Sequence, residues 1–252
     1  RVPEDFGTVQ SAIDAATPGD FVNVGPGTYN ELLDMQGKAV VLFGRDGAAA
    51  TTIDATGLGG SAIVCMNGET PNTVIAGLTL TGGTGTLNPV WQTLQGGGIF
   101  IYTASPTVVN CVLTLNTSEF GGGGIWAQNS QSYFANLRFD DNHTLLETRG
   151  GGGLYLWNSS ATVSRCSFSN NTADSGGGLR CKGGGSANVR LCSFVNNTAS
   201  EFGGGVAVTS ATPSFDRCLF RGNVAGSYGG GVSTGGVLTT PPYPPATLPR
   251  NR

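Results

Sequence analysis

Charged side chains are scarce in this chain: Asp, Glu, Lys and Arg together make up 12 % of its 252 residues. Lys38 and Lys182 are the only lysines, His143 is the only histidine, and the formal net charge is −3. Proteins that bind nucleic acid neutralise the backbone phosphates with clustered lysine and arginine. A chain this poor in positive charge is therefore not expected to bind nucleic acid.

Long hydrophobic runs are missing as well. No segment approaches the about 20 apolar residues that a membrane-spanning helix needs, so we expect no membrane span. The chain begins at Arg1 and not at a methionine, which favours a removed signal peptide over an arbitrary chain boundary. We therefore expect a protein that is secreted, extracellular or displayed on a cell surface.

Familiar catalytic motifs are also absent from the sequence. It has no metal-binding motif, and no helix with lysine and serine or threonine follows a glycine triplet, as a phosphate-binding loop would require. We expect no cofactor and no metal. The densest polar group could form a small acid–base site, although a solvated loop is the favoured interpretation; it comprises Asp140, Asp141, His143, Glu147 and Arg149.

Glycine, by contrast, is abundant, with 42 residues, and much of it falls in a repeat. Six glycine triplets each precede an aliphatic residue, and their last glycines are 25 to 29 residues apart: Gly98, Gly124, Gly153, Gly178, Gly205 and Gly231. Apolar and polar positions alternate after each triplet, as in Ile99 and Ile101, which indicates a short strand. A helical solenoid is disfavoured because each glycine would destabilise a helix by about 1 kcal/mol.

Two further markers run in phase with the triplets. An asparagine follows a phenylalanine or leucine by three residues in five successive repeats, at Asn116, Asn142, Asn171, Asn197 and Asn223. A small or aliphatic apolar residue precedes the same phenylalanine or leucine by two, at Cys111, Leu137, Cys166, Cys192 and Cys218. The shared period predicts an all-β fold, a right-handed parallel β-helix with coils of about 26 residues, in which the asparagines stack as a buried ladder.

The repeat also predicts the state of the six cysteines. Four of them occupy the position that Leu137 fills in its own coil, and Cys181 occupies the position of Leu156 and Val208. These positions are those of small apolar core residues, so we expect free buried thiols and no disulfide framework.

The two ends of the chain differ from the repeat. Residues 6–16 have the apolar spacing of a short helix, which we expect within an N-terminal cap over residues 1–20. The predicted β-helix spans residues 1–238 and carries a side loop over residues 84–95. Residues 239–252 form a proline-rich tail that cannot be a coil.

These motifs resemble two known groups of proteins. The segments Val9 to Ala16, Pro18-Gly19-Asp20 and Gly27-Thr28-Tyr29 are similar to the opening of pectin-lyase-like β-helix proteins. The Phe-x-x-Asn and Gly-Gly-Gly-aliphatic motifs resemble the repeats of the polymorphic outer-membrane protein family, which implies a surface passenger used in adhesion. The chain departs from that family in its proline-rich end and in showing no barrel segment after the repeats.

Three functions remain open at this stage. The leading prediction is an extracellular structural and adhesive protein that binds glycans on a polysaccharide or glycoprotein surface, or assembles with its own copies. The rival prediction is a polysaccharide lyase or glycoside hydrolase of the pectin-lyase-like fold, although the sequence does not show the calcium-binding carboxylates and basic residue that the resemblance to lyases implies. The third is a carbohydrate-binding module without catalytic activity.

The alternation after the triplets places a set of aromatic and basic residues on the outer face. We expect an exposed stripe that binds a glycan, its cations favouring an acidic sugar, or a partner protein, unless residues Val90 and Trp91 of the side loop cover it. The stripe comprises Phe100, Tyr102, Trp126, Tyr155, Trp157, Arg180 and Lys182.

Two more features bear on partners. Asn116, Asn142, Asn158, Asn170 and Asn196 lie in N-glycosylation sequons, of which the last three are outside the predicted ladder and could carry glycans. The tail segment Pro241-Pro242-Tyr243-Pro244-Pro245 favours a polyproline II strand, which could dock on the aromatic stripe of the same or the next subunit. Such docking would build a head-to-tail homopolymer.

Overall fold

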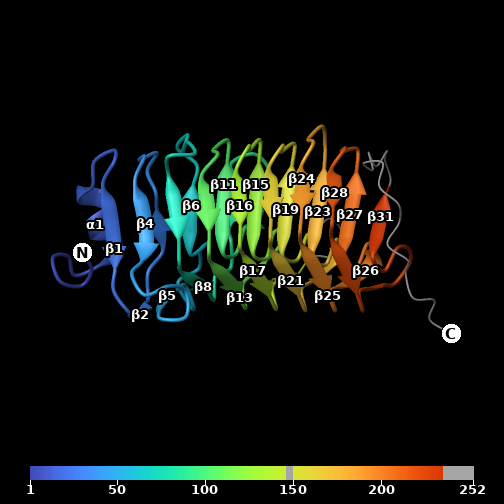
Figure 1. The fold of residues 1–252 in the computed structure, drawn as a ribbon, viewed down its shortest axis with the longest axis horizontal. Helices are drawn as coiled ribbons and strands as arrows, with labels where there is room; N and C mark the ends of the chain where they lie inside the picture. Colours follow the sequence, from blue (N-terminus) through green and yellow to red (C-terminus); the bar gives the residue numbers. More distant parts are fainter. Residues whose placement is uncertain (146–149, 235–252) are drawn as a thin grey trace.

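The computed structural model describes residues 1–145 and 150–234 of the chain. Residues Glu147 and Arg149 of the polar group and the proline-rich tail, residues 239–252, lie outside the described residues. Within the described residues the chain winds into a parallel solenoid, with the N-terminal helix at one end and the last coil at the other (Figure 1). The predicted all-β solenoid with one short N-terminal helix is confirmed.

Three faces of the solenoid are parallel sheets of eight strands each. Sheet A comprises β1 (Phe21–Val24), β4 (Val41–Gly44), β7 (Val74–Ala76), β12 (Thr107–Val109), β16 (Tyr133–Ala135), β20 (Thr162–Ser164), β24 (Asn188–Arg190) and β28 (Ser214–Asp216). Sheet B comprises β2 (Gly27–Tyr29), β5 (Thr51–Asp54), β8 (Thr79–Thr81), β13 (Val112–Thr114), β17 (Arg138–Asp140), β21 (Ser167–Ser169), β25 (Ser193–Val195) and β29 (Leu219–Arg221). Sheet C comprises β3 (Leu33–Asp34), β6 (Ile63–Cys65), β11 (Ile99–Tyr102), β15 (Ile125–Gln128), β19 (Leu154–Trp157), β23 (Leu179–Lys182), β27 (Val206–Thr209) and β31 (Val232–Thr234).

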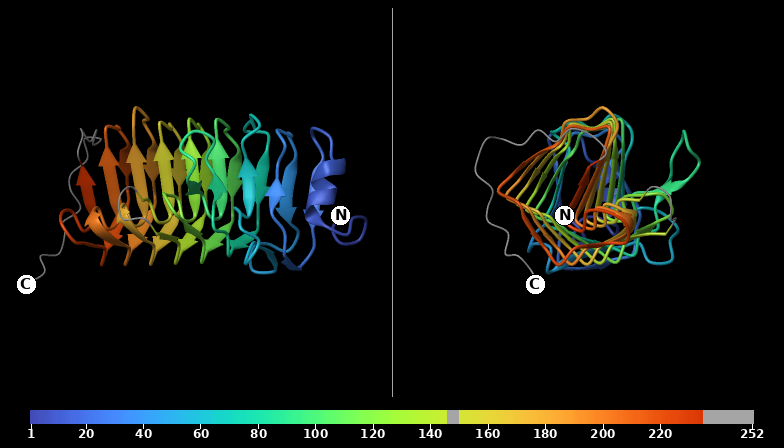
Figure 2. Two further views of the ribbon diagram at one scale, coloured as in Figure 1. Left: turned by 180° about the vertical axis from the view of Figure 1, so that it is seen from behind. Right: turned by 90° about the vertical axis from the view of Figure 1, so that its right-hand side faces the viewer.

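Two smaller sheets complete the fold. Sheet D is an antiparallel hairpin of β9 (Thr86–Leu87) and β10 (Leu94–Gln95), within the segment predicted as a side loop. Seen along the axis of the solenoid, this teal-green hairpin projects from one side of the nested coils (Figure 2). Sheet E lies between sheets B and C along the chain and comprises β14 (Thr117–Ser118), β18 (His143–Thr144), β22 (Thr172–Ser175), β26 (Thr198–Phe202) and β30 (Val224–Ala225).

Equivalent residues of successive coils stack in register and fill the interior. In sheet C, Ile99 pairs with Ile125, and Leu154 pairs with Leu179. In sheet B, the rings of Phe168 and Phe194 are parallel within 5° with centroids 4.7 Å apart. Each coil therefore buries its apolar side chains against the same kind of side chain above and below, which is how a strand of three or four residues gains enough contact to be stable.

The glycine triplets are needed because neighbouring coils pass too close for a side chain. A Cβ atom on Gly124 would lie 2.5 Å from the carbonyl oxygen of Gly153 in the next coil. Gly122, two residues earlier, has a φ of +66°, a backbone conformation that residues with a Cβ adopt at an energetic cost. The repeat of the triplets in the sequence thus reflects a close approach of backbones at the corner that leads into the sheet C strands from β11 onwards.

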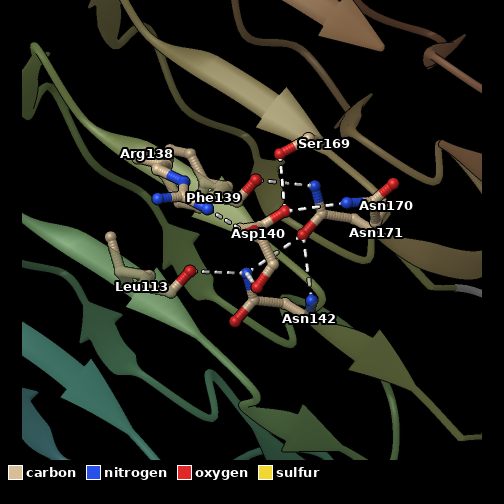
Figure 3. A network of polar contacts seen from close by, with 8 residues as sticks. All are labelled: Leu113, Arg138, Phe139, Asp140, Asn142, Ser169, Asn170 and Asn171. Carbon is tan, nitrogen blue, oxygen red and sulfur yellow. Dashed lines mark hydrogen bonds and ion pairs between the residues drawn. The ribbon is translucent and has the colours of Figure 1, made fainter. Parts of the chain in front are cut away.

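The asparagines Asn116, Asn142, Asn171 and Asn197 are buried and Asn223 is half-buried in the last complete coil. Each side chain hydrogen-bonds to the next: the Nδ2 of Asn142 donates to the Oδ1 of Asn171 at 3.0 Å, and the backbone N–H of Asn142 donates to the same oxygen at 3.0 Å. The Nδ2 of Asn142 also donates to the carbonyl oxygen of Leu113 at 2.9 Å (Figure 3). Every buried amide thus has partners in the coils on both sides.

Helix α1 (Val9–Ala15) covers the first coil and is shorter than the predicted residues 6–16. The helix begins after Thr8, which is the N-cap. Thr8 has an extended backbone, and its side-chain oxygen accepts a hydrogen bond from the N–H of Ser11. The carboxylate of Glu31 accepts the N–H groups of Val9 and Gln10 at 2.8 and 2.9 Å. Val9 and Ile13 are buried, so the helix closes the N-terminal end of the core.

All six cysteines are free, and five of them are buried; Cys218 in the last complete coil is half-buried. Burial raises the pKa of Cys111 and of Cys181 to about 12. Thiols with such pKa values stay protonated at neutral pH and are poor nucleophiles. The cysteines are core residues in this structure and belong to no reactive site.

Candidate functional site

The aromatic stripe points away from the solenoid interior but is not exposed. Phe100, Trp126 and Tyr155 are fully buried and form a second apolar cluster, separate from the main core. Trp91 of the hairpin covers them, with its ring centroid 5.6 Å from that of Trp126 and 4.6 Å from that of Trp157. Of the two alternatives that the sequence left open, the structure shows the covered stripe for Phe100, Trp126 and Tyr155, because the side loop folds back onto sheet C.

Buried amides hold the hairpin in place. The Nδ2 of Asn88 donates to the Oε1 of Gln95 at 2.7 Å and to the Oε1 of Gln128 in sheet C at 3.1 Å. The Oδ1 of Asn88 accepts the N–H of Val90 at 2.8 Å and that of Trp91 at 3.2 Å. Asn88 therefore joins the hairpin tip, the hairpin base and the sheet below it, and the aromatic groove suggested for the tail is already filled by Trp91.

Three of the remaining stripe residues are less deeply buried. Tyr102, Trp157 and Lys182 are half-buried. The Nζ of Lys182 lies 4.9 Å from the ring centroid of Trp157, and the guanidinium carbon of Arg180 lies 5.4 Å from the ring centroid of Tyr155. Both cations therefore pack on aromatic rings of the preceding coil, and sheet C changes at Arg180 from an aromatic to a polar surface.

A small open pocket of about 150 Å³ begins at this change, and we call it the Arg180 pocket. Its walls come from the outer face of sheet C (β23, β27 and β31) and from the ends of β22 and β26 in sheet E. Figure 1 shows β23, β26, β27 and β31 in the C-terminal part of the solenoid. It is lined by Asp174, Ser175, Arg180, Glu201, Phe202, Ala207, Val208, Thr209 and Ser233.

A buried pair of opposite charges forms the floor of the Arg180 pocket. The Nη1 of Arg180 lies 3.8 Å from the Oδ1 of Asp174, and these side chains are 8 % and 1 % exposed. The same Nη1 donates to the carbonyl oxygen of Gly150 at 3.3 Å, and the N–H of Gly150 donates to the Oδ1 of Asp174. Among the described residues, the Oδ2 of Asp174 and the Nε of Arg180 have no hydrogen-bond partner.

The environment of Asp174 changes its acidity. Burial raises the pKa of Asp174 above the ordinary value of an aspartate, and the nearby carboxylate of Glu201 adds to this effect. The Gly150 N–H, the Arg180 guanidinium and the Ser175 N–H oppose it without cancelling it. A buried carboxyl group with one unused oxygen, next to a guanidinium with one unused N–H, is costly unless something else supplies the missing partners.

Two exposed aromatic rings stand at the rim of the Arg180 pocket. Phe202 lines the pocket, and its ring is parallel within 5° to that of Tyr228, with centroids 6.0 Å apart. Phe202 is 38 % exposed and Tyr228 is 72 % exposed. Exposed rings of this size, held parallel by neighbouring coils, offer a rigid apolar face to a ligand.

Within the described residues, Asp140 of the polar group links two neighbouring coils through hydrogen bonds. Burial alone would raise the pKa of Asp140, but hydrogen bonds from Ser169, Arg138 and Asn170 lower it overall (Figure 3). The Ser169 hydroxyl lies 2.6 Å and the Asn170 Nδ2 lies 3.0 Å from the Oδ1 of Asp140. Asp140 is thus an ionised group that ties two coils together, and no group of His, Cys, Asp and Glu suited to a metal ion occurs among residues 1–145 and 150–234.

The sequon asparagines fall into two sets. Asn116 and Asn142 are buried in the ladder, whereas Asn158, Asn170 and Asn196 are exposed at turns with φ values of +49°, +56° and +55°. The Oδ1 of Asn158 accepts the N–H of Gly184, and the Nδ2 of Asn170 is bonded to Asp140. Glycosylation of the three exposed residues stays a prediction.

Sequence reasoning identified Arg180 but missed Asp174, Glu201, Phe202 and Tyr228. These four follow the ladder asparagines Asn171, Asn197 and Asn223 by three to five residues. They lie just before the glycine triplets, where each coil turns from sheet E towards sheet C. Their regular distance from the ladder asparagines can be read from the sequence. It does not reveal that this corner of the coil stands over the outer face of sheet C.

Comparison with known proteins supports the architecture. The family model described as a right handed beta helix region matches residues 27–239. A search of curated proteins and a search of solved structures found no match. The resemblance to the polymorphic outer-membrane protein family therefore stays a prediction. None of the helices in the described part of the chain is long and apolar enough to cross a membrane.

Proposed function

Because the chain belongs to the right-handed β-helix family, we propose that it is an extracellular structural and adhesive protein that binds a glycan in the Arg180 pocket. The fold alone does not carry this proposal, since β-helices host many functions. It rests on one juxtaposition: the stacked, exposed rings of Phe202 and Tyr228 stand beside a pocket with buried, unsatisfied hydrogen-bonding atoms.

This combination suits a sugar better than most small ligands. One face of a pyranose ring consists of C–H groups, which pack on aromatic rings. The hydroxyl groups at the ring edge both donate and accept hydrogen bonds, and they match the carboxylates of Asp174 and Glu201 and the guanidinium of Arg180. The hydroxyl groups of Thr209 and Ser233 line the same pocket. A shallow site of this kind binds one unit at the end or side of a longer glycan, as an adhesive contact with a polysaccharide or glycoprotein surface requires.

The proposal is tested by binding of the purified protein to an array of oligosaccharides, followed by titration of those that bind. Phe202→Ala and Tyr228→Ala should each weaken binding by about tenfold or more, which corresponds to about 1.4 kcal/mol. Phe21→Ala is the matched control, because Phe21 is 68 % exposed at the opposite end of the solenoid. Absence of any glycan binding, or equal loss in the Phe21 variant, would contradict the proposal.

One observation favours glycoside hydrolysis as a second candidate function. Glycosidases use a carboxylic acid with a raised pKa together with a second carboxylate, and Asp174 and Glu201 in the Arg180 pocket meet these two requirements of chemistry. Release of reducing ends from a bound oligosaccharide, abolished by Glu201→Gln, would establish this function in place of simple binding. Binding without turnover would support the adhesive role.

Self-assembly is the remaining part of the expectation. The head-to-tail homopolymer through residues 239–252 stays a prediction, because the tail lies outside the described residues. At the N-terminal end, α1 covers the first coil, so another subunit would meet the outer side of this helix and not an open strand edge. Removal of residues 239–252 followed by light scattering at high concentration tests the prediction, and an unchanged assembly state would end it.

A further inference from the structure

We propose that the Arg180 pocket prefers a hexosamine unit with a free amino group over neutral and acidic sugars. This inference rests on the proposed function and adds the chemical class of the sugar. It replaces the expectation from the sequence that the cations of the stripe favour an acidic sugar.

The charge inventory of the Arg180 pocket argues against an acidic ligand. Two carboxylates, those of Asp174 and Glu201, and one guanidinium, that of Arg180, line the pocket. The guanidinium already faces Asp174 at 3.8 Å. Lys182 does not line the pocket, and its ammonium group packs on the ring of Trp157. A uronic acid would therefore bring a third carboxylate to a site in which the described residues supply one cation, which is unfavourable in a partly buried setting.

The unsatisfied atoms indicate what the ligand must supply. The Oδ2 of Asp174 needs a donor and the Nε–H of Arg180 needs an acceptor, and both groups are more than nine-tenths buried. An ammonium group supplies three donors and a positive charge, whereas a hydroxyl oxygen supplies an acceptor. A 2-amino sugar carries both on neighbouring carbons. The unsatisfied atoms of Asp174 and Arg180 are closed to solvent in this structure, so binding needs a small shift of these two side chains. The ammonium group of the sugar would then bond to Asp174 and Glu201, while the adjacent hydroxyl oxygen accepts from Arg180.

The raised pKa of Asp174 in the Arg180 pocket is consistent with a cationic ligand. Burial raises the pKa of Asp174, and the Glu201 carboxylate adds to the rise. The Gly150 N–H, the Arg180 guanidinium and the Ser175 N–H favour the ionised form but do not restore the ordinary pKa. A bound ammonium group supplies the missing positive charge, and charge-assisted hydrogen bonds of this kind are about twice as strong as neutral ones.

Acetylation of the amine should weaken binding for two reasons. An N-acetyl group has no positive charge and offers one donor in place of three. It is also bulkier, and the Arg180 pocket has a volume of about 150 Å³. A neutral hydroxyl at the same carbon would fit but would leave the second carboxylate without a counter-charge. The expected order of affinity is therefore the free amine, then the neutral sugar, then the N-acetyl and the uronic acid sugars.

Calorimetric titration with four oligosaccharides of equal length tests this inference: glucosamine, N-acetylglucosamine, glucose and galacturonic acid tetramers. The measurement is made in mildly acidic buffer, where the amino groups are protonated. The glucosamine tetramer should bind about tenfold more tightly than the glucose tetramer, which corresponds to about 1.4 kcal/mol. Equal affinity for these two, or tightest binding of the galacturonic acid tetramer, would overturn the inference while leaving glycan binding intact.

A charge-neutral variant separates the amine preference from folding. Glu201 is exposed, so Glu201→Gln should leave stability unchanged and bring the affinity ratio of the glucosamine to the glucose tetramer close to one, whatever its effect on the absolute affinity for glucose. Glu4→Gln, which also removes one exposed negative charge but at the N-terminal end, should retain the preference. Preference retained in the Glu201 variant would contradict the assignment. If none of the four tetramers binds to the unmodified protein, the proposed function fails together with the inference.

Discussion

Single amide groups determine how well the coils of this protein hold together. The Oδ1 of Asn171 accepts hydrogen bonds from the backbone N–H and the Nδ2 of Asn142, and its own Nδ2 donates to Phe139 and Asn197. All of these groups are buried, so water cannot replace a lost partner. One asparagine therefore satisfies polar atoms of three successive coils.

Replacement of Asn171 by alanine should destabilise the protein by about 1–3 kcal/mol, because several buried donors and acceptors lose their partner at once. Asn188→Ala is the control, since Asn188 is exposed at the start of β24 and should change stability by less than about 0.5 kcal/mol. Chemical denaturation of the two variants gives the comparison. Equal stability of the two would show that the ladder contributes nothing beyond the backbone hydrogen bonds.

The raised pKa of Asp174 predicts a dependence of stability on pH. The folded protein binds the proton of Asp174 more tightly than the unfolded chain, so this group's contribution is fully present below the ordinary aspartate pKa. It is lost as the pH rises through the raised value. The free energy of unfolding of the unmodified protein relative to Asp174→Asn should therefore fall over that window and stay level on both sides.

The contribution of Asp140 to the free energy of unfolding depends on pH in the opposite sense, because the pKa of Asp140 is lowered. This contribution is lost as the pH falls through the lowered pKa. Asp140 is present in both proteins of the comparison, so its effect cancels in the difference. A difference in unfolding free energy that does not change with pH would show that Asp174 is no more difficult to ionise in the folded state than in the unfolded chain.

At the scale of elements, the repeat and the position of the insertion over residues 84–95 could be predicted, whereas the way the insertion folds was left open. Strands such as β15 and β19 follow from alternation after a glycine triplet, because a period of two places alternate side chains on one face. The hairpin of β9 and β10 has no copy elsewhere in the chain, so no period shows where it folds. Whether Trp126 is exposed depends on that fold, and only the three-dimensional structure shows Trp91 above it.

Removal of the Trp91 ring should uncover the aromatic cluster beneath the hairpin. The protein has three tryptophans, so the double variant Trp91→Ala, Trp157→Phe leaves Trp126 as the only fluorescent indole. Its emission should shift to longer wavelength and acrylamide should quench it more strongly, because Trp126 is fully buried in the unmodified protein. Trp91→Phe with Trp157→Phe retains a ring over the cluster and is the matched control.

The same experiment has a clear contrary result. If the emission and quenching of Trp126 are the same in the alanine and phenylalanine variants, other parts of the hairpin bury the cluster without the Trp91 ring. The polar contacts of Asn88 with Gln95 and Gln128 would then be the main link between hairpin and sheet.

For the molecule as a whole, the sequence repeat predicts that the coils stack along one axis. It predicts only part of the Arg180 pocket. Arg180 was found because it follows a triplet at an outward position, as do Phe100 and Trp126. Asp174, Glu201 and Tyr228 lie at the coil corner, where no alternation shows which way a side chain points. The Arg180 pocket forms because this corner stands beside sheet C in space, which is a property of the wound chain and not of any one coil.

The solenoid also separates its surfaces along the axis. The hairpin covers the aromatic part of sheet C in the middle coils, while the Arg180 pocket and its aromatic rim lie in the C-terminal coils. The opposite end carries α1 and the exposed ring of Phe21. Binding at one end of a rigid rod would leave the other end free to project from, or attach to, a surface.

Hydrogen exchange measured by mass spectrometry, with and without a saturating glucosamine tetramer, tests the central claim most directly. The ligand should slow exchange in peptides that cover β22, β23, β26 and β27, because these strands build the Arg180 pocket. Peptides of sheet A around Phe21 should exchange at the same rate in both samples. Protection centred on sheet A, or no protection in the pocket strands under conditions where binding is measured, would contradict the account.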